Sequence, residues 1–119
     1  MSHSLVYMTF PDREAALSIC RRLVEDRLVA CANVLGAATS LYRWDGKLCE
    51  DAEVVAVAKT STALVGAVTD AVKSLHPYDC PCVVALPIAG GNPAYLAWLD
   101  AETAAPKTKP DRASQIGAT

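Results

Sequence analysis

Two thiols, an imidazole and a carboxylate lie close together in the segment HPYDCPCVVALP, residues 76–87. Cysteine thiolate and imidazole nitrogen are donors that copper and zinc accept in proteins. Cys80 and Cys82 are spaced Cys-x-Cys, which differs from the Cys-x2-Cys knuckle of structural zinc, and no second knuckle supplies two more ligands. The segment is therefore a candidate metal site, but it is not a self-contained zinc motif.

Each of these side chains also has a purely structural interpretation. Cys82 begins a run typical of a buried strand, where cysteine serves as a small apolar residue, and Cys80 should be more open because it precedes a proline. If both belong to the strand, alternation places their thiols on one side together with Val84 and Leu86. His76 ends a helix, where the imidazole either reaches a cleft or interface or caps helix carbonyls. Both interpretations of the histidine remain open.

The sequence does not indicate an enzyme. It contains two histidines, and it lacks a P-loop, a GxGxxG loop and an HExxH helix. Asp79 and His76 could polarise Cys80, but nothing in the sequence supplies an oxyanion hole for a thiol nucleophile. We therefore expect no catalytic activity.

Composition limits the remaining functional classes. The chain has 119 residues, of which 52% are hydrophobic and 20% charged, which predicts one globular domain. Its net charge of −2 with scattered Lys and Arg argues against nucleic-acid binding. No apolar run approaches a membrane span, and the N-terminal residues do not fit a secretory signal. We expect a cytoplasmic protein whose five cysteines are free thiols.

The segments that must position the candidate residues begin with a strand and a helix. Residues 4–10, SLVYMTF, form a β-branched and aromatic run that predicts a strand. Asp12 can then cap a helix that runs to about residue 26. Apolar side chains recur along it at helical spacing, namely Ala16, Ile19, Cys20, Leu23 and Val24. Cys20 is therefore expected in the core.

A long β-hairpin follows. Asp45-Gly46 is typical of a two-residue type I′ turn, and extended runs flank it on both sides. This turn predicts that Tyr42 lies opposite Cys49 across the ladder. Gly36 predicts a bend or bulge within the first of the two strands.

The chain then continues through a second helix. Residues 54–58, VVAVA, are apolar on both faces, which predicts a central strand. Ser61 or Thr62 should open the helix. The helix should end at His76, because a residue before proline is pushed out of the α region.

The remaining segments complete an α+β fold. Residues 82–88 are the last predicted strand, residues 93–102 a short amphipathic helix, and residues 103–119 a loose tail beyond a domain of residues 1–102. The order predicts a ferredoxin-like βαββαβ sandwich with an antiparallel sheet, a long hairpin and a C-terminal helix. Two helices cover only one face of a sheet whose strands are apolar on both faces. A second copy of the chain is the simplest cover for the other face.

Five collinear segments resemble the CutA divalent-ion tolerance proteins, and together they span about residues 5–100. They are TFPDREAA, LVACANVLGAATSLYRWDGKL, EVVAVAKT, LHPYDCP and VVALPIAGGNPAYLAWL. The resemblance implies a ferredoxin-like fold and a tightly interlocked cytoplasmic homotrimer similar in architecture to the trimeric PII proteins. It also implies that the protein binds copper or other divalent metal ions.

The resemblance implies particular metal ligands. Copper binding in the family is associated with a soft donor before the Thr of the first-strand motif and with the His of the HPY turn, here Met8 and His76. Cys82 stands where HPYEVPE-type sequences have glutamate, so a soft thiol replaces a hard carboxylate, and Cys80 lies beside it. The alternative implied function is a PII-like regulatory or scaffolding trimer that binds a small ligand or a partner protein at intersubunit clefts.

Overall fold

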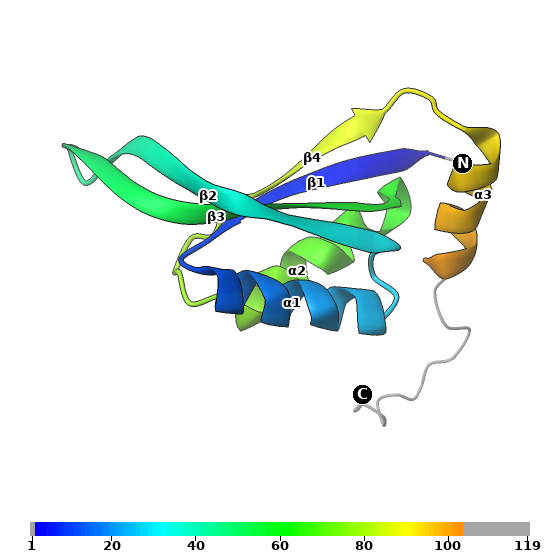
Figure 1. Ribbon diagram of the computed structural model, residues 1–119, viewed down its shortest axis with the longest axis horizontal. Coiled ribbons are helices and arrows are strands. Elements are labelled where there is room, and N and C mark those ends of the chain that lie inside the picture. Colours follow the sequence, from blue (N-terminus) through cyan, green and yellow to red (C-terminus); the bar gives the residue numbers. More distant parts are fainter. Residues whose placement is uncertain (1, 104–119) are drawn as a thin grey trace.

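A four-stranded antiparallel sheet with two helices on one face makes up the fold, and the computed structural model describes residues 2–103 (Figure 1). The elements are β1 (His3–Phe10), α1 (Arg13–Glu25), β2 (Cys31–Trp44), β3 (Lys47–Ser61), the 3₁₀ turn η1 (Thr62–Leu64), α2 (Val65–Leu75), β4 (Val83–Ile88) and α3 (Pro93–Glu102). The strand order is β2-β3-β1-β4. This arrangement confirms the predicted α+β class and βαββαβ order.

Helix α1 begins and packs as its sequence predicts. The Asp12 carboxylate accepts a hydrogen bond from the Ala15 backbone N–H at 2.8 Å, which satisfies one of the free donors of the first turn. Four residues of the predicted stripe are buried against the sheet: Ala16, Ile19, Cys20 and Leu23. Val24 was expected with them but is 40% exposed.

The core lies between β1 and the helices. Val6, Met8 and Phe10 alternate along β1 and are fully buried on the helix side. In the neighbouring strand β3, Ala56 and Ala58 are fully buried in the same cluster. The intervening residues of both strands face the other side of the sheet, which neither α1 nor α2 covers (Figure 1).

The hairpin has the predicted turn and register. Asp45 and Gly46 have φ values of 53° and 77°, as a type I′ turn requires. Tyr42 pairs with Cys49, which confirms the predicted register. The pairing shifts on either side of Gly36, which confirms the predicted irregularity in β2.

Beyond the body of the sheet, the hairpin continues as a two-stranded ribbon. The last pair between β1 and β3 joins Phe10 to Val54, and residues 38–53 extend past it (Figure 1). We call residues 38–53 the arm. Large apolar side chains of the arm are exposed, with Leu41 at 65%, Trp44 at 60% and Leu48 at 77%.

Two predicted boundaries differ in part from the structure. The second helical segment begins at Thr62, one of its two predicted starts, but residues 62–64 form a 3₁₀ turn and the α-helix begins at Val65. Ser61 precedes this turn without a side-chain cap and still pairs with His3 in the sheet. Strand β4 begins at Val83, because its ladder with β1 ends at the Met8–Val83 pair.

Cys80 and Cys82 therefore lie in the turn before β4, and the strand alternation predicted for them does not apply. Val84 and Leu86, which were expected to pack, are 53% and 52% exposed in the single chain. They pair with residues on the β1 face that points away from the helices.

Helix α3 lies at the end of the sheet away from the arm (Figure 1). His3 Nε2 lies 2.8 Å from an Asp100 carboxylate oxygen and ties β1 to this helix. Thr103, the first residue of the predicted tail, is buried and donates its hydroxyl to the Leu99 carbonyl. The rest of that tail, residues 104–119, lies outside the described residues.

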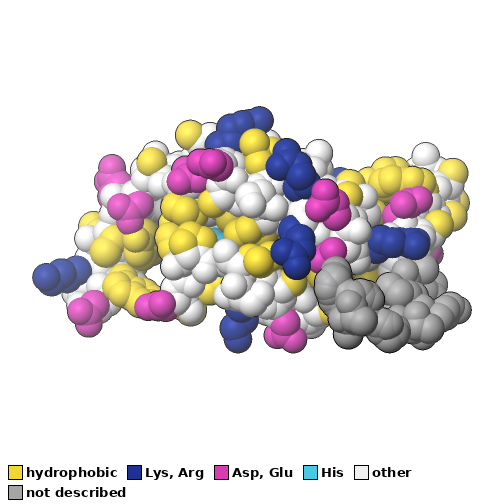
Figure 2. Space-filling view, turned by 90° about the horizontal axis from the view of Figure 1, so that it is seen from below, with side chains coloured by type: hydrophobic (Ala, Val, Ile, Leu, Met, Phe, Trp, Pro, Cys, Tyr) yellow, Lys and Arg dark blue, Asp and Glu magenta, His cyan; other side chains and the backbone are white. Residues whose placement is uncertain are grey.

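Across residues 2–103, no helix combines the length and the apolar character needed to cross a bilayer. Figure 2 shows the molecule from the helix side, where Lys and Arg side chains alternate with Asp and Glu. This face carries no continuous basic surface that would neutralise a phosphate backbone.

Candidate functional site

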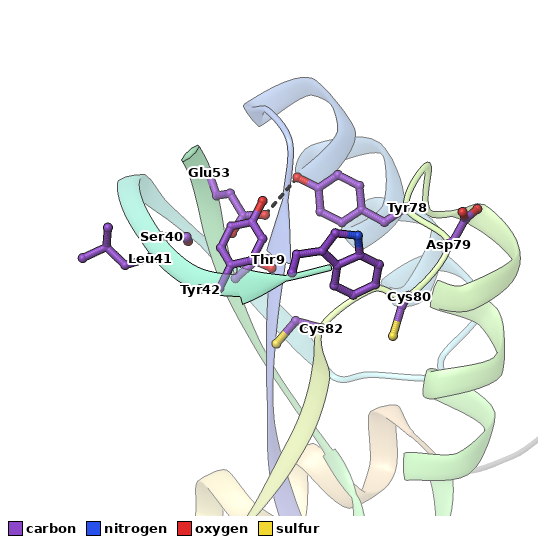
Figure 3. Close-up of a pocket in the computed structure, with 10 residues that line it drawn as sticks. Thr9, Ser40, Leu41, Tyr42, Glu53, Tyr78, Asp79, Cys80 and Cys82 are labelled. Carbon is purple, nitrogen blue, oxygen red and sulfur yellow. Dashed lines mark hydrogen bonds between the residues drawn. The ribbon is translucent and has the colours of Figure 1, made fainter. Parts of the chain in front are cut away.

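A cavity of about 510 Å³ lies where the arm meets the turn before β4 (Figure 3). The arm contributes Tyr42, Trp44 and Glu53 to its lining, together with two neighbouring residues, Ser40 and Leu41. Thr9, near the end of β1, lines the floor of the cavity. The cavity lies between the hairpin, whose strands continue past the last β1–β3 pair, and the turn before β4.

Residues 78–82 form the opposite wall. Tyr78 donates its hydroxyl to Glu53 Oε2 at 2.9 Å, which joins the two walls (Figure 3). Burial and this hydrogen bond raise the pKa of Tyr78 to about 12. On the arm, Tyr42 donates its hydroxyl to Asp51, and this bond and burial raise the pKa of Tyr42 to about 12. Both phenols therefore stay neutral donors at physiological pH.

Cys80 and Cys82 line the same cavity as free thiols. In Figure 3 their sulfurs lie on one side of the drawn residues, across from the hydrogen bond between Tyr78 and Glu53. Cys80 is exposed, whereas Cys82 is half-buried. Burial and the Glu53 charge raise the pKa of the Cys82 thiol, while a hydrogen bond with Thr9 lowers it. The turn thus places two soft donors in the lining of one cavity.

His76 lies beneath this wall rather than in it. The ring is 7% exposed, and its Nε2 donates to the Thr9 carbonyl at 2.8 Å. Its Nδ1 accepts the Tyr78 backbone N–H at 3.1 Å, so the proton is on Nε2 and both nitrogens are engaged. The ring also packs on Phe10 and Tyr78, with centroids 5.1 Å and 4.7 Å away.

The structure therefore differs from both sequence interpretations of His76. The imidazole neither opens into the cleft nor caps helix carbonyls; it joins the end of β1 to the turn that carries Tyr78. Only its backbone N–H closes α2, by donating to the Val72 carbonyl.

Met8 is separated from the cavity by the sheet itself. Its side chain is fully buried on the helix side, whereas the next residue, Thr9, lines the cavity. Successive side chains of a strand point to opposite faces, so Met8 and the two thiols lie on different sides. Among residues 2–103, no three His, Cys, Asp or Glu side chains are grouped to hold a metal ion.

Several site features escaped sequence reasoning. The arm aromatics Tyr42 and Trp44 looked like ordinary strand residues, and only the hairpin register could have suggested that they point toward the HPY turn. The link between Tyr78 and Glu53 was equally hidden, because 25 residues separate them in the chain. These contacts join residues far apart in the chain, so local sequence patterns do not predict them.

Known proteins resemble this chain in both sequence and structure. Residues 4–102 match the family described as CutA1 divalent ion tolerance protein. Divalent-cation tolerance protein CutA of Thermus thermophilus is 46% identical over 99 residues, which cover 83% of this chain and 96% of that protein. Protein CutA of Mus musculus is 46% identical over 98 residues, and the chain spans only 55% of its length.

Solved structures agree with the sequence comparison. The Cut A1 structure from Thermus thermophilus has a TM-score of 0.83 and 46% identity, covering 85% of this chain and 98% of that one. CutA1 from Oryza sativa has a TM-score of 0.85 at 38% identity, covering 91% of this chain and 97% of that one. The family is named for tolerance of divalent ions and not for a catalysed reaction. The chain belongs to the CutA1 divalent ion tolerance protein family.

Proposed function

We propose that the protein is a cytosolic, homotrimeric divalent-cation tolerance protein that binds copper, or another soft or divalent ion, through Cys82 and Cys80. The observation that carries this proposal is the presence of both thiols in one cavity, in a chain of this family. Thiolate sulfur favours Cu(I) over the harder divalent ions, and Cu(I) accepts as few as two such donors.

In the proposed site, His76 and Met8 can bind the ion only after a rearrangement. Each would have to leave its present contacts to reach an ion: His76 its two hydrogen bonds, and Met8 the core. In its present position His76 supports the site by fixing the backbone of Tyr78.

Copper titration of the reduced protein tests the site. Cu(I), buffered by a chromophoric chelator, and Cu(II) are titrated into wild type, Cys82→Ala, Cys80→Ala and His76→Ala. Cys49→Ala is the matched control, because this arm cysteine does not line the cavity. We expect Cys82→Ala to weaken Cu(I) binding by about tenfold or more, equivalent to about 1.4 kcal/mol. Unchanged affinity in both His76→Ala and Cys82→Ala would remove the proposed site.

The pH dependence of binding gives an independent readout. Because burial and Glu53 raise the pKa of Cys82, protons compete with the ion for this thiolate at neutral pH. Cu(I) affinity should therefore increase with pH and should do so less steeply in Cys82→Ala. A pH-independent affinity in the wild type would exclude thiolate ligands.

Exposed apolar surface supports the homotrimer. Val84 and Leu86 are half exposed on the sheet face without helices, and the arm exposes Leu48, which does not line the cavity. Exposed large apolar side chains of this kind are typical of interfaces. All five cysteines are free, which suits a reducing compartment such as the cytosol. Native mass spectrometry with metal analysis should find three chains and bound metal; a monomer would contradict the assembly.

A PII-like regulatory or scaffolding trimer is the second candidate function. It is favoured by the cavity, whose volume of about 510 Å³ suits a small metabolite. A thermal-shift screen of metabolites tests this function. A screen in which metal ions are the only stabilisers would count against it.

A further inference from the structure

The cavity has a lining that the thiol chemistry leaves unexplained. Three aromatic rings, Tyr42, Trp44 and Tyr78, and two carboxylates, Glu53 and Asp79, line it, and no Lys or Arg is among its described lining residues. The rings come from both walls, because Tyr42 and Trp44 lie on the arm and Tyr78 lies in the turn. A ligand in the cavity therefore meets aromatic surface on two sides.

This lining favours cations and disfavours anions. The face of an aromatic ring carries partial negative charge, and the carboxylates add formal negative charge at the cavity wall. The same field disfavours the anionic forms of its own members, since the Glu53 charge contributes to the raised pKa of both Tyr78 and Cys82. A phosphate-bearing ligand would find no cationic partner in this lining.

The type of cation follows from the available donors. A hard metal ion needs several grouped oxygen ligands, and residues 2–103 offer no group of three His, Cys, Asp or Glu side chains. Glu53 already accepts the Tyr78 hydroxyl, and Tyr42 bonds to Asp51. Aromatic faces instead suit a large, weakly hydrated cation whose charge is spread over carbon substituents.

We propose that this cavity binds a small organic ammonium ion of the quaternary or methylated class. The alkyl groups would contact the rings of Tyr42, Trp44 and Tyr78, and the charge would face Glu53, whereas Asp79 lies at the outer side of the turn (Figure 3). Cavities of roughly 300–1,000 Å³ are typical of small-molecule sites, and about 510 Å³ lies within that range. This inference rests on the second candidate function, ligand binding at the cavity, and is independent of copper binding.

Choline and its uncharged isostere 3,3-dimethylbutan-1-ol are the probes that test charge at constant shape. Each is titrated into the full-length reduced protein by calorimetry. We expect saturable choline binding and at least about tenfold weaker binding of the alcohol, since cation–π attraction and the carboxylates act only on the charged ligand. Equal binding of the two probes, or no saturable choline binding, would overturn the inference.

Variants locate the site. Trp44→Leu should weaken choline binding by roughly 2- to 30-fold, the range that one cation–π contact supplies. Trp98→Leu is the matched control, because this tryptophan lies on α3 against Tyr95 and does not line the cavity. Glu53→Gln keeps an acceptor for Tyr78 but removes the charge, so it should weaken choline and leave the alcohol unchanged. Equal losses in Trp44→Leu and Trp98→Leu would place binding elsewhere and overturn the inference.

Two controls separate this inference from the proposed functions. The double variant Cys80→Ser/Cys82→Ser should lose Cu(I) and retain choline, whereas Glu53→Gln should retain its oligomeric state by native mass spectrometry. If the protein binds Cu(I) but does not bind choline, the ammonium site is refuted and the copper site is retained. If the protein does not bind choline but an uncharged or anionic metabolite stabilises it, the ammonium inference is refuted and ligand binding by the cavity is retained.

Discussion

Replacing His76 by alanine tests whether this imidazole acts as a structural link or as a metal donor. In the structure it bonds to Thr9 O and to the Tyr78 backbone N–H, and it stacks on Phe10. If these contacts are its main role, His76→Ala should destabilise the fold strongly and should weaken Cu(I) binding only modestly.

The expected destabilisation can be worked out from these contacts. Losing the bond to the buried Thr9 carbonyl leaves that acceptor unsatisfied, at about 1–3 kcal/mol, and the bond from Tyr78 adds about 0.5–1 kcal/mol. The two aromatic contacts contribute about 0.5–1.5 kcal/mol each beyond area burial. Together these contributions predict a loss of about 2.5–7 kcal/mol in unfolding free energy.

Guanidinium chloride unfolding followed by circular dichroism measures this loss. The protomer concentration must be fixed, because association into the proposed trimer would contribute to apparent stability. His3→Ala is the matched control, since it removes an equally buried imidazole with a single side-chain bond, to Asp100. It should cost about 1–2 kcal/mol. A His76→Ala loss no larger than that of His3→Ala, together with abolished Cu(I) binding, would refute the structural role.

Three further predictions concern thiols and glycines. Cys80 is exposed and should react with a disulfide reagent faster than Cys82, whose pKa is raised chiefly by burial; equal rates at pH 8 would contradict this order. Burial raises the pKa of Cys20 from 9.0 to about 11, so the unfolded chain releases this proton first. The resulting stability is complete below about pH 9 and is lost as pH rises to about 11, and unfolding curves of Cys20→Ala should lack this part of the decline. Gly46→Ala should lower the unfolding free energy by about 1 kcal/mol, because residue 46 has a φ of 77°. Gly66→Ala in α2 should raise the unfolding free energy by up to about 1 kcal/mol, because no atom lies within 4 Å of the added Cβ. Denaturation midpoints that move in the same direction for both glycine variants would contradict the backbone argument.

Most of the fold could be predicted from the sequence because its signals are local. The helical spacing of apolar residues, the Asp12 cap and the Asp45-Gly46 turn each act within a few residues, and each is present in the structure. The α-helix begins three residues later than predicted, and Ser61 makes no side-chain cap because its pairing with His3 keeps it in the strand. The conformation of Ser61 is determined by its pairing partner in β1, which local helix propensity does not take into account.

The candidate site was less predictable. The HPY turn drew attention to Cys80 and Cys82, and both line the cavity. The position of His76 could not be predicted, because its hydrogen-bond acceptor, Thr9, lies 67 residues away in the chain. The contribution of Tyr42 required the hairpin register and the strand order together. Chemistry-bearing residues are visible in a sequence, whereas the contacts that engage them are not.

In the proposed trimer, the unequal support of the two cavity walls would link ligand binding to subunit association. Beyond Val54 the arm pairs only with itself among the described residues, and a two-stranded ribbon is marginally stable in water. The turn wall is instead anchored to the core through His76. A ligand that bridges both walls therefore restrains the arm, and a second chain that restrains the arm pre-forms the cavity. By thermodynamic reciprocity the two effects share one coupling free energy, so ligand should tighten subunit association by the same factor by which association tightens ligand binding. Amide hydrogen exchange across residues 38–53 would report both events.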